Sequence, residues 1–209
     1  MRARDKAIIN DLYRFRCMSR DDIADIHFGD MRNPTKEANV VLKRLRRDGH
    51  IDANTQMQPY VYFAADSKIK RSSQKIAHFL GIVGFYRELI RYEAPTVFDI
   101  EPKLGDKGTP EPDTFTIWKG TPFFIEIQRS QYSERIMSEK ITRYERYYYE
   151  EEWRYASWQP KDRPPVFPYI WIISEVNYRL ASSCLRFVQS KSVAELIERT
   201  ETPQYKAVR

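Results

Sequence analysis

Cysteine is scarce in this chain of 209 residues, and long apolar segments are absent. The two cysteines, Cys17 and Cys184, lie far apart in the sequence and form no CxxC or Cys/His cluster, so they support neither a disulfide framework nor a zinc site. No apolar run approaches the roughly 20 residues that a transmembrane helix needs. The charged start of the chain, MRARDKAIIND, lacks the apolar core of a signal peptide. We therefore expect a cytoplasmic protein with no membrane partner.

Acidic side chains are fewer than basic ones: the chain has 29 aspartates and glutamates and 35 lysines and arginines, which gives a formal charge of +6. Residues 1–72 hold 15 basic and 10 acidic side chains, whereas the rest of the chain is almost balanced. Apolar residues make up 42% of the chain, which argues against disorder. A basic N-terminal third favours an acidic partner, of which nucleic acid is the commonest.

Three helices are predicted in this basic third. Apolar residues at helical spacing predict the first over residues 4–16. Ser19, followed three residues later by Asp22, resembles a capping box and predicts the start of a short second helix. Asn33-Pro34 combines a cap residue with a first-turn proline, and predicts a third helix that ends at Gly49.

The predicted third helix has two different faces. Val41, Leu42 and Leu45 form the apolar one, which we expect to be buried. After this helix, residues 50–53 and 60–63 flank a polar loop and predict a two-stranded hairpin. Three helices and a hairpin, with the third helix the most basic, form the winged helix-turn-helix arrangement, whose third helix enters the DNA major groove. The exposed face carries the residue types that contact phosphates and base edges, namely Lys36, Asn39, Lys43, Arg46 and Arg47.

Polar and basic residues 64–72 predict a junction between two domains. We expect a DNA-binding domain over residues 1–70 and a second domain over residues 71–209. For the first domain an alternative stays open, in which its lysines and arginines only solvate the surface of a protein-interaction domain.

The second domain is predicted to be α/β, so the chain is α+β overall. The strand that contains Glu126 and the strand that begins near Val166 should be joined by a right-handed βαβ crossover. The latter strand is almost wholly apolar, as expected for an interior strand buried on both faces. The predicted elements are a helix over residues 72–93, strands over 96–102, 115–118 and 121–130, a helix over 133–153, a strand over 166–174, and helices over 176–189 and 192–199.

Two acidic residues are the main candidates for chemistry in this domain. Asp113 precedes one strand of a predicted hairpin and Glu126 lies in the next, so the hairpin should bring the two carboxylates together. An unpaired charged Glu in a buried strand costs several kcal/mol or forces protonation. Mg²⁺ or Mn²⁺ would supply the missing partner. Alternatively, Asp113 caps a turn and Glu126 pairs with Arg129 or Lys140.

Pro112-Asp113 before one strand and Glu126-x-Gln128 on the next resemble the PD-(D/E)XK nuclease-like fold, an α/β sandwich with a central mixed sheet. The resemblance implies that Asp113 and Glu126 are ligands of Mg²⁺ or Mn²⁺. It implies further that Gln128 takes the place of the family's lysine, and that Glu88 or Glu93 on the first helix completes the catalytic site.

Gln128 is a departure from that family pattern. A glutamine can hydrogen-bond a water or a phosphate, but it cannot act as a base or supply positive charge. The resemblance implies that a basic residue from the following helix replaces the family's lysine. Lys140 is the leading candidate for that role, ahead of Arg129.

The two halves together resemble the replication-relaxation family of plasmids, phages and other mobile elements of Gram-positive bacteria. The resemblance covers roughly residues 5–190 and is carried by DIAxIxF (Asp22–Phe28), FFIEIQR (Phe123–Arg129) and KITRYxxYY (Lys140–Tyr148). It implies double-stranded DNA as the partner, with replication or relaxosome proteins as further ones.

Two classes of function follow. The first is a DNA-binding protein that acts in plasmid or phage replication or in conjugative relaxation, and whose second domain either nicks DNA with a water activated by Mg²⁺ or serves as a degenerate scaffold. The alternative is a non-enzymatic DNA-binding accessory factor or transcriptional regulator with a degenerate nuclease fold. The sequence leaves the oligomeric state open, with a homodimer as one option.

Overall fold

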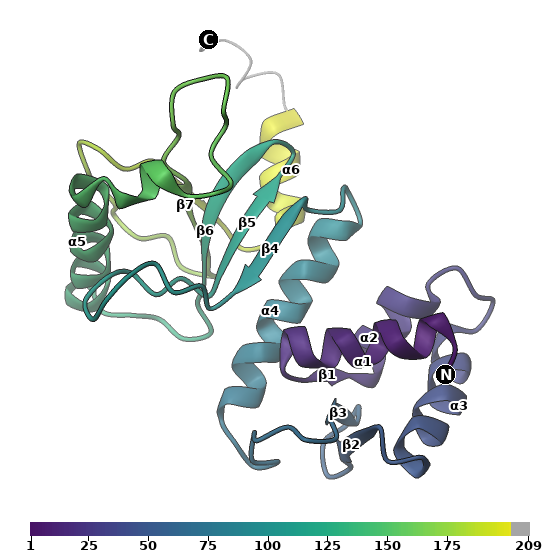
Figure 1. Cartoon of the computed structure of the whole chain (residues 1–209). Coiled ribbons are helices and arrows are strands. Elements are labelled where there is room, and N and C mark those ends of the chain that lie inside the picture. The colour runs from purple at the N-terminus through teal and green to yellow at the C-terminus, as the bar shows by residue number, and fades with distance from the viewer. Residues whose placement is uncertain (202–209) are drawn as a thin grey trace. The chain divides into compact units, whose positions relative to one another are not determined.

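The computed structural model describes residues 1–201. The chain forms two compact units, Met1–Arg87 and a second that begins at Glu88. The part described is mixed α/β, with six α-helices and two sheets (Figure 1), so the predicted α/β class is confirmed. No helix within residues 1–201 is long and apolar enough to cross a membrane.

The N-terminal unit packs three helices on a small antiparallel sheet of strand order β1-β3-β2. Its core is formed by buried apolar side chains from every helix, among them Ile8, Ile23 and Leu42. The predicted hairpin is confirmed as β2 and β3, which pair antiparallel. The elements are α1 (Ala3–Phe15), β1 (Met18–Ser19), α2 (Arg20–Phe28), α3 (Pro34–Arg47), β2 (Ile51–Asn54) and β3 (Val61–Ala64).

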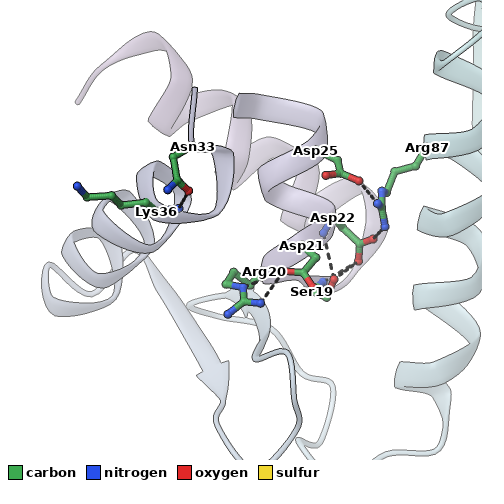
Figure 2. A network of polar contacts seen from close by, with 8 residues as sticks. All are labelled: Ser19, Arg20, Asp21, Asp22, Asp25, Asn33, Lys36 and Arg87. Carbon is green, nitrogen blue, oxygen red and sulfur yellow. Dashed lines mark hydrogen bonds and ion pairs between the residues drawn. The ribbon is translucent and has the colours of Figure 1, made fainter. Parts of the chain in front are cut away.

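Both predicted caps are confirmed. The Ser19 hydroxyl accepts from the Asp22 N–H at 3.1 Å, and the Asp22 carboxylate accepts from the Ser19 N–H at 2.9 Å, which completes a capping box. The Asn33 side chain accepts from the Lys36 N–H at 3.1 Å (Figure 2). On α3, Ala38 takes the core position that had been expected for Val41, which is only half-buried.

A partly buried ion pair joins α1 to α3. Asp5 is almost fully buried, and its carboxylate accepts from the Arg44 guanidinium at 2.7 Å and from the Arg2 N–H at 3.0 Å. The hydrogen bond from Arg44 lowers the pKa of Asp5, although burial opposes it.

We therefore expect Asp5 to make the stability of the N-terminal unit pH-dependent. Since the folded pKa lies below the unfolded one, the contribution is complete above about pH 4 and is lost as the pH falls through the folded pKa. Asp5→Asn should lower the free energy of unfolding by about 1–3 kcal/mol at neutral pH and by less in acid. Urea unfolding at several pH values measures this, with Asp30→Asn as an exposed control. An equal loss at all pH values would contradict the assignment.

Helix α4 (Lys75–Ile90) begins in the N-terminal unit. The thiol of Cys17 lies 3.9 Å from the Ile76 carbonyl oxygen, and Arg87 forms ion pairs with Asp22 and Asp25 of α2. These contacts explain why the second unit begins at Glu88, whereas the junction in the sequence suggested residue 71.

The second unit is built on a five-stranded mixed sheet of order β4-β5-β6-β7-β8. Its first three strands are antiparallel, and β6, β7 and β8 run parallel, as expected for a crossover through α5. Figure 1 shows α5 on one side of the sheet and α6 on the other. The elements are β4 (Val97–Ile100), β5 (Thr114–Trp118), β6 (Thr121–Ile127), α5 (Glu134–Glu150), the 3-10 turn η1 (Glu152–Tyr155), β7 (Tyr169–Ile173), β8 (Phe187–Ser190) and α6 (Val193–Glu201).

The predicted helix over residues 176–189 is wrong. This segment is irregular until β8, which pairs with β7. Side chains there bond the backbone in place of helical hydrogen bonds: the Gln189 amide bonds both the N–H and the carbonyl of Tyr178, at 2.8 and 2.9 Å. The Ser182 hydroxyl likewise accepts from the Leu185 N–H at 3.3 Å. Such local bonds compete with helix formation.

Candidate nucleic-acid interface and acidic cluster

A pocket of about 700 Å³ lies between α3 and the β2–β3 hairpin of the N-terminal unit. We call it the α3 groove. It brings together four of the five residues predicted to contact DNA, whereas the fifth, Lys36, is exposed on α3 outside it. The groove is lined by Arg20, Asn39, Leu42, Lys43, Arg46, Arg47, Gln58, Tyr60 and Tyr62.

The groove is electropositive. No aspartate or glutamate lines it, and within residues 1–201 neither Lys43 nor Arg46 forms an ion pair. Arg47 is paired with Asp48 at 3.0 Å. Burial raises the pKa of Tyr62, while Arg46 and Arg20 are near enough to oppose that rise. Exposed cations without a fixed carboxylate partner are suited to neutralising phosphates.

Four polar or aromatic groove residues were missed by sequence reasoning: Arg20, Gln58, Tyr60 and Tyr62. Tyr60, 38% exposed, follows the loop of the hairpin, and its carbonyl accepts from the Arg20 N–H at 2.8 Å. That bond brings the start of α2 to the hairpin. The polar composition of the loop was visible in the sequence, but its position opposite α3 was not.

The second candidate site is an acidic cluster on the face of β6 that packs against α5. The Glu126 side chain is 2% exposed, and the Tyr144 hydroxyl donates to its Oε1 at 2.7 Å. The Lys140 ammonium donates to its Oε2. Asp113 precedes β5, and its Oδ2 accepts from the Ile127 N–H at 2.6 Å. The structure thus brings three predicted site residues, Asp113, Glu126 and Lys140, to one place.

The electrostatics of the cluster reflect two carboxylates around one ammonium. Burial and the neighbouring Asp113 raise the pKa of Glu126, while Lys140 opposes them. Burial also acts to lower the pKa of Lys140, but the Glu126 carboxylate outweighs it and raises that pKa, so Lys140 is an ammonium at neutral pH. Burial and Glu126 raise the pKa of Tyr144 well above its usual range, which keeps its hydroxyl protonated and donating.

Comparison with known proteins supplies the family. The chain matches the family described as replication-relaxation over residues 9–160. It belongs to the replication-relaxation family. No curated protein and no solved structure matches the chain. The matched range includes the α3 groove residues and the whole acidic cluster. Membership in the replication-relaxation family suggests a role in the replication or relaxation of mobile genetic elements.

The acidic cluster of this replication-relaxation protein does not fit a divalent metal as it is arranged. Both carboxylate oxygens of Glu126 already accept hydrogen bonds, and Asp113 accepts one from the backbone. Among the residues that the structure describes, no three Asp, Glu, His or Cys side chains are grouped for metal binding. Mg²⁺ is usually held by one or two carboxylates together with waters, and here the Lys140 ammonium already occupies one of the oxygens that would bind it.

Glu88 and Gln128 make other contacts than those of the catalytic site predicted from the sequence. The Glu88 carboxylate accepts from the Val193 N–H at 2.8 Å, at the first residue of α6. Gln128 donates its backbone N–H to the Ile173 carbonyl, but both polar atoms of its side chain are buried without a partner in residues 1–201. Glu93 accepts from the Trp118 indole through its backbone carbonyl at 2.8 Å.

The unpartnered Gln128 amide leads to a stability prediction. Burying an amide without hydrogen bonds costs about 1–3 kcal/mol, so Gln128→Met should raise the free energy of unfolding by about 1 kcal/mol. Gln159→Met is the matched control, because the Gln159 amide bonds Trp153 once and Val166 twice, and its loss should be destabilising. Urea unfolding of both variants checks this; a destabilised Gln128→Met protein would show that the amide has a partner in solution.

Proposed function

We propose that this chain is a DNA-binding accessory factor in the replication or relaxation of a mobile element. The N-terminal unit is a winged helix-turn-helix, α3 is its recognition helix, and the β2–β3 hairpin is its wing. The observation that carries the proposal is the α3 groove, where the exposed side chains of Lys43 and Arg46 form no ion pair within the described residues. Double-stranded DNA in the cytoplasm is the proposed ligand.

The groove supplies both kinds of contact that a DNA reader uses. Lysine and arginine neutralise phosphates, whereas Asn39 and Gln58 carry amides that can bond base edges in the major groove. The apolar side of α3, with Leu42 and Leu45 fully buried, anchors the helix so that its polar side faces outward. A groove lined by basic and no acidic side chains fits an anionic ligand such as DNA better than a protein-interaction surface.

Fluorescence anisotropy of the full chain with a labelled DNA duplex tests the proposal. Binding should weaken steeply between about 50 and 200 mM salt, because log K falls by about 0.9 per phosphate contact for each unit of log salt. Absence of binding to any duplex at low salt would refute it. The same titrations with replication or relaxosome proteins, and sedimentation of the DNA complex, test further partners and a homodimer.

Metal-dependent nicking is a second candidate function. The convergence of Asp113, Glu126 and Lys140 favours it, and the hairpin β5–β6 followed by parallel β7 supports a PD-(D/E)XK nuclease-like fold for the second unit. It ranks second because both Glu126 oxygens are already bonded. Incubation of supercoiled plasmid with Mn²⁺ tests it: nicking that Asp113→Ala abolishes would establish the enzyme.

A further inference from the structure

Lys140 and Tyr144 lie one helical turn apart on the face of α5 that meets β6. From there the ammonium reaches one oxygen of Glu126 and the hydroxyl reaches the other. The Lys140 side chain is 22% exposed, so the ion pair is largely removed from water. Its Nζ also lies 5.8 Å from the centre of the Tyr132 ring, a cation–π arrangement.

A carboxylate buried this deeply requires a positive partner, since an isolated buried charge is costly. Asp113 adds a second negative charge close by and cannot serve. Its own carboxylate accepts from the β6 backbone at Ile127, so it extends the β5–β6 pairing by one bond. Lys140 is therefore the cation that compensates the pair.

We infer that Lys140 is the resident counter-ion of the Asp113–Glu126 pair, in the role that a divalent metal has in nuclease sites. The second unit holds this cluster together without metal, and the cluster stabilises the packing of α5 on the sheet. A divalent-cation site is latent: it forms only when the Lys140 ammonium is removed. This inference concerns the second unit and does not depend on DNA binding by the first.

Thermal unfolding of the full chain with and without millimolar Mn²⁺ tests the inference. Wild type should unfold at the same temperature in both conditions. Lys140→Met should lower the midpoint by on the order of 10 °C, because it leaves the buried Glu126 charge unpaired. Mn²⁺ should restore part of that loss by binding the folded state.

Two further variants distinguish the effect of the Lys140 charge from the effect of its packing. In Lys140→Met/Glu126→Gln, which removes both charges, the midpoint should recover above that of Lys140→Met and should not respond to Mn²⁺. Lys103→Met removes a lysine that is 76% exposed and paired with Glu111, and should change nothing.

The inference fails if wild type is stabilised by Mn²⁺ and Asp113→Asn is not, because the metal then binds despite Lys140. Should Lys140→Met not fold, calorimetric titration of wild type with Mn²⁺ still decides: absence of binding heat supports the inference, and heat that Asp113→Asn removes overturns it. A Lys140→Met protein as stable as wild type and indifferent to Mn²⁺ also overturns it.

Discussion

Replacing Lys43 and Arg46 together by alanine is expected to weaken duplex DNA binding by at least about tenfold at moderate salt. Each phosphate contact contributes about 0.9 to the slope of log K against log salt, so the double variant should flatten that slope by about two. Both side chains line the α3 groove, and neither is held in an ion pair within residues 1–201. Arg47 is a weaker choice because Asp48 already pairs with it.

The matched control for this variant is Lys6→Ala/Lys68→Ala. It removes the same charge from the same unit at two exposed lysines outside the groove. If binding depended only on net charge, the two double variants would lose the same affinity. Equal losses would therefore contradict a defined interface on α3, whereas a loss confined to the groove variant would support it. Anisotropy titrations at several salt concentrations provide both the affinity and the slope.

Arg87→Ala is expected to destabilise the N-terminal unit by about 2–4 kcal/mol. Arg87 of α4 donates to the Asp22 carboxylate at 2.7 Å and also pairs with Asp25 (Figure 2). The Asp22 side chain is only 6% exposed and belongs to the capping box of α2. Without Arg87, this carboxylate remains buried with its Ser19 hydrogen bonds but with no compensating charge.

Hydrogen exchange of the α2 amides is the appropriate measurement for Arg87→Ala, because a chain of two compact units need not unfold in one step. Protection of α2 should fall along with the unfolding free energy. Arg20→Ala is the control, since both side chains of the Arg20–Asp21 pair are partly open to water, where an ion pair contributes little. Arg87→Lys should recover only part of the loss, as one ammonium cannot replace the two-pronged guanidinium. Unchanged exchange in Arg87→Ala would refute the proposed role.

Local chemistry in the sequence predicted most elements correctly. Ser19 with Asp22, and Asn33 before Pro34, mark helix starts through bonds between residues three apart, so their geometry depends on little else. The prediction for residues 176–189 was wrong because helical periodicity there competes with Gln189 and Ser182, whose side chains bond the backbone up to eleven residues away. Hydrogen bonds between a side chain and a distant backbone group cannot be predicted from the periodicity of apolar residues.

The sequence by itself determined the α/β class, the basic face of α3 and the placement of Asp113 directly before β5 and of Glu126 on the neighbouring β6. Each of these depends on periodicity, capping or hairpin pairing over short distances. Only the tertiary structure decided that Arg20 and Tyr60 join the α3 groove, that Glu88 bonds the start of α6, and that Lys140 and Tyr144 occupy both oxygens of Glu126. A buried carboxylate needs some partner, but which cation reaches it depends on how α5 packs on the sheet.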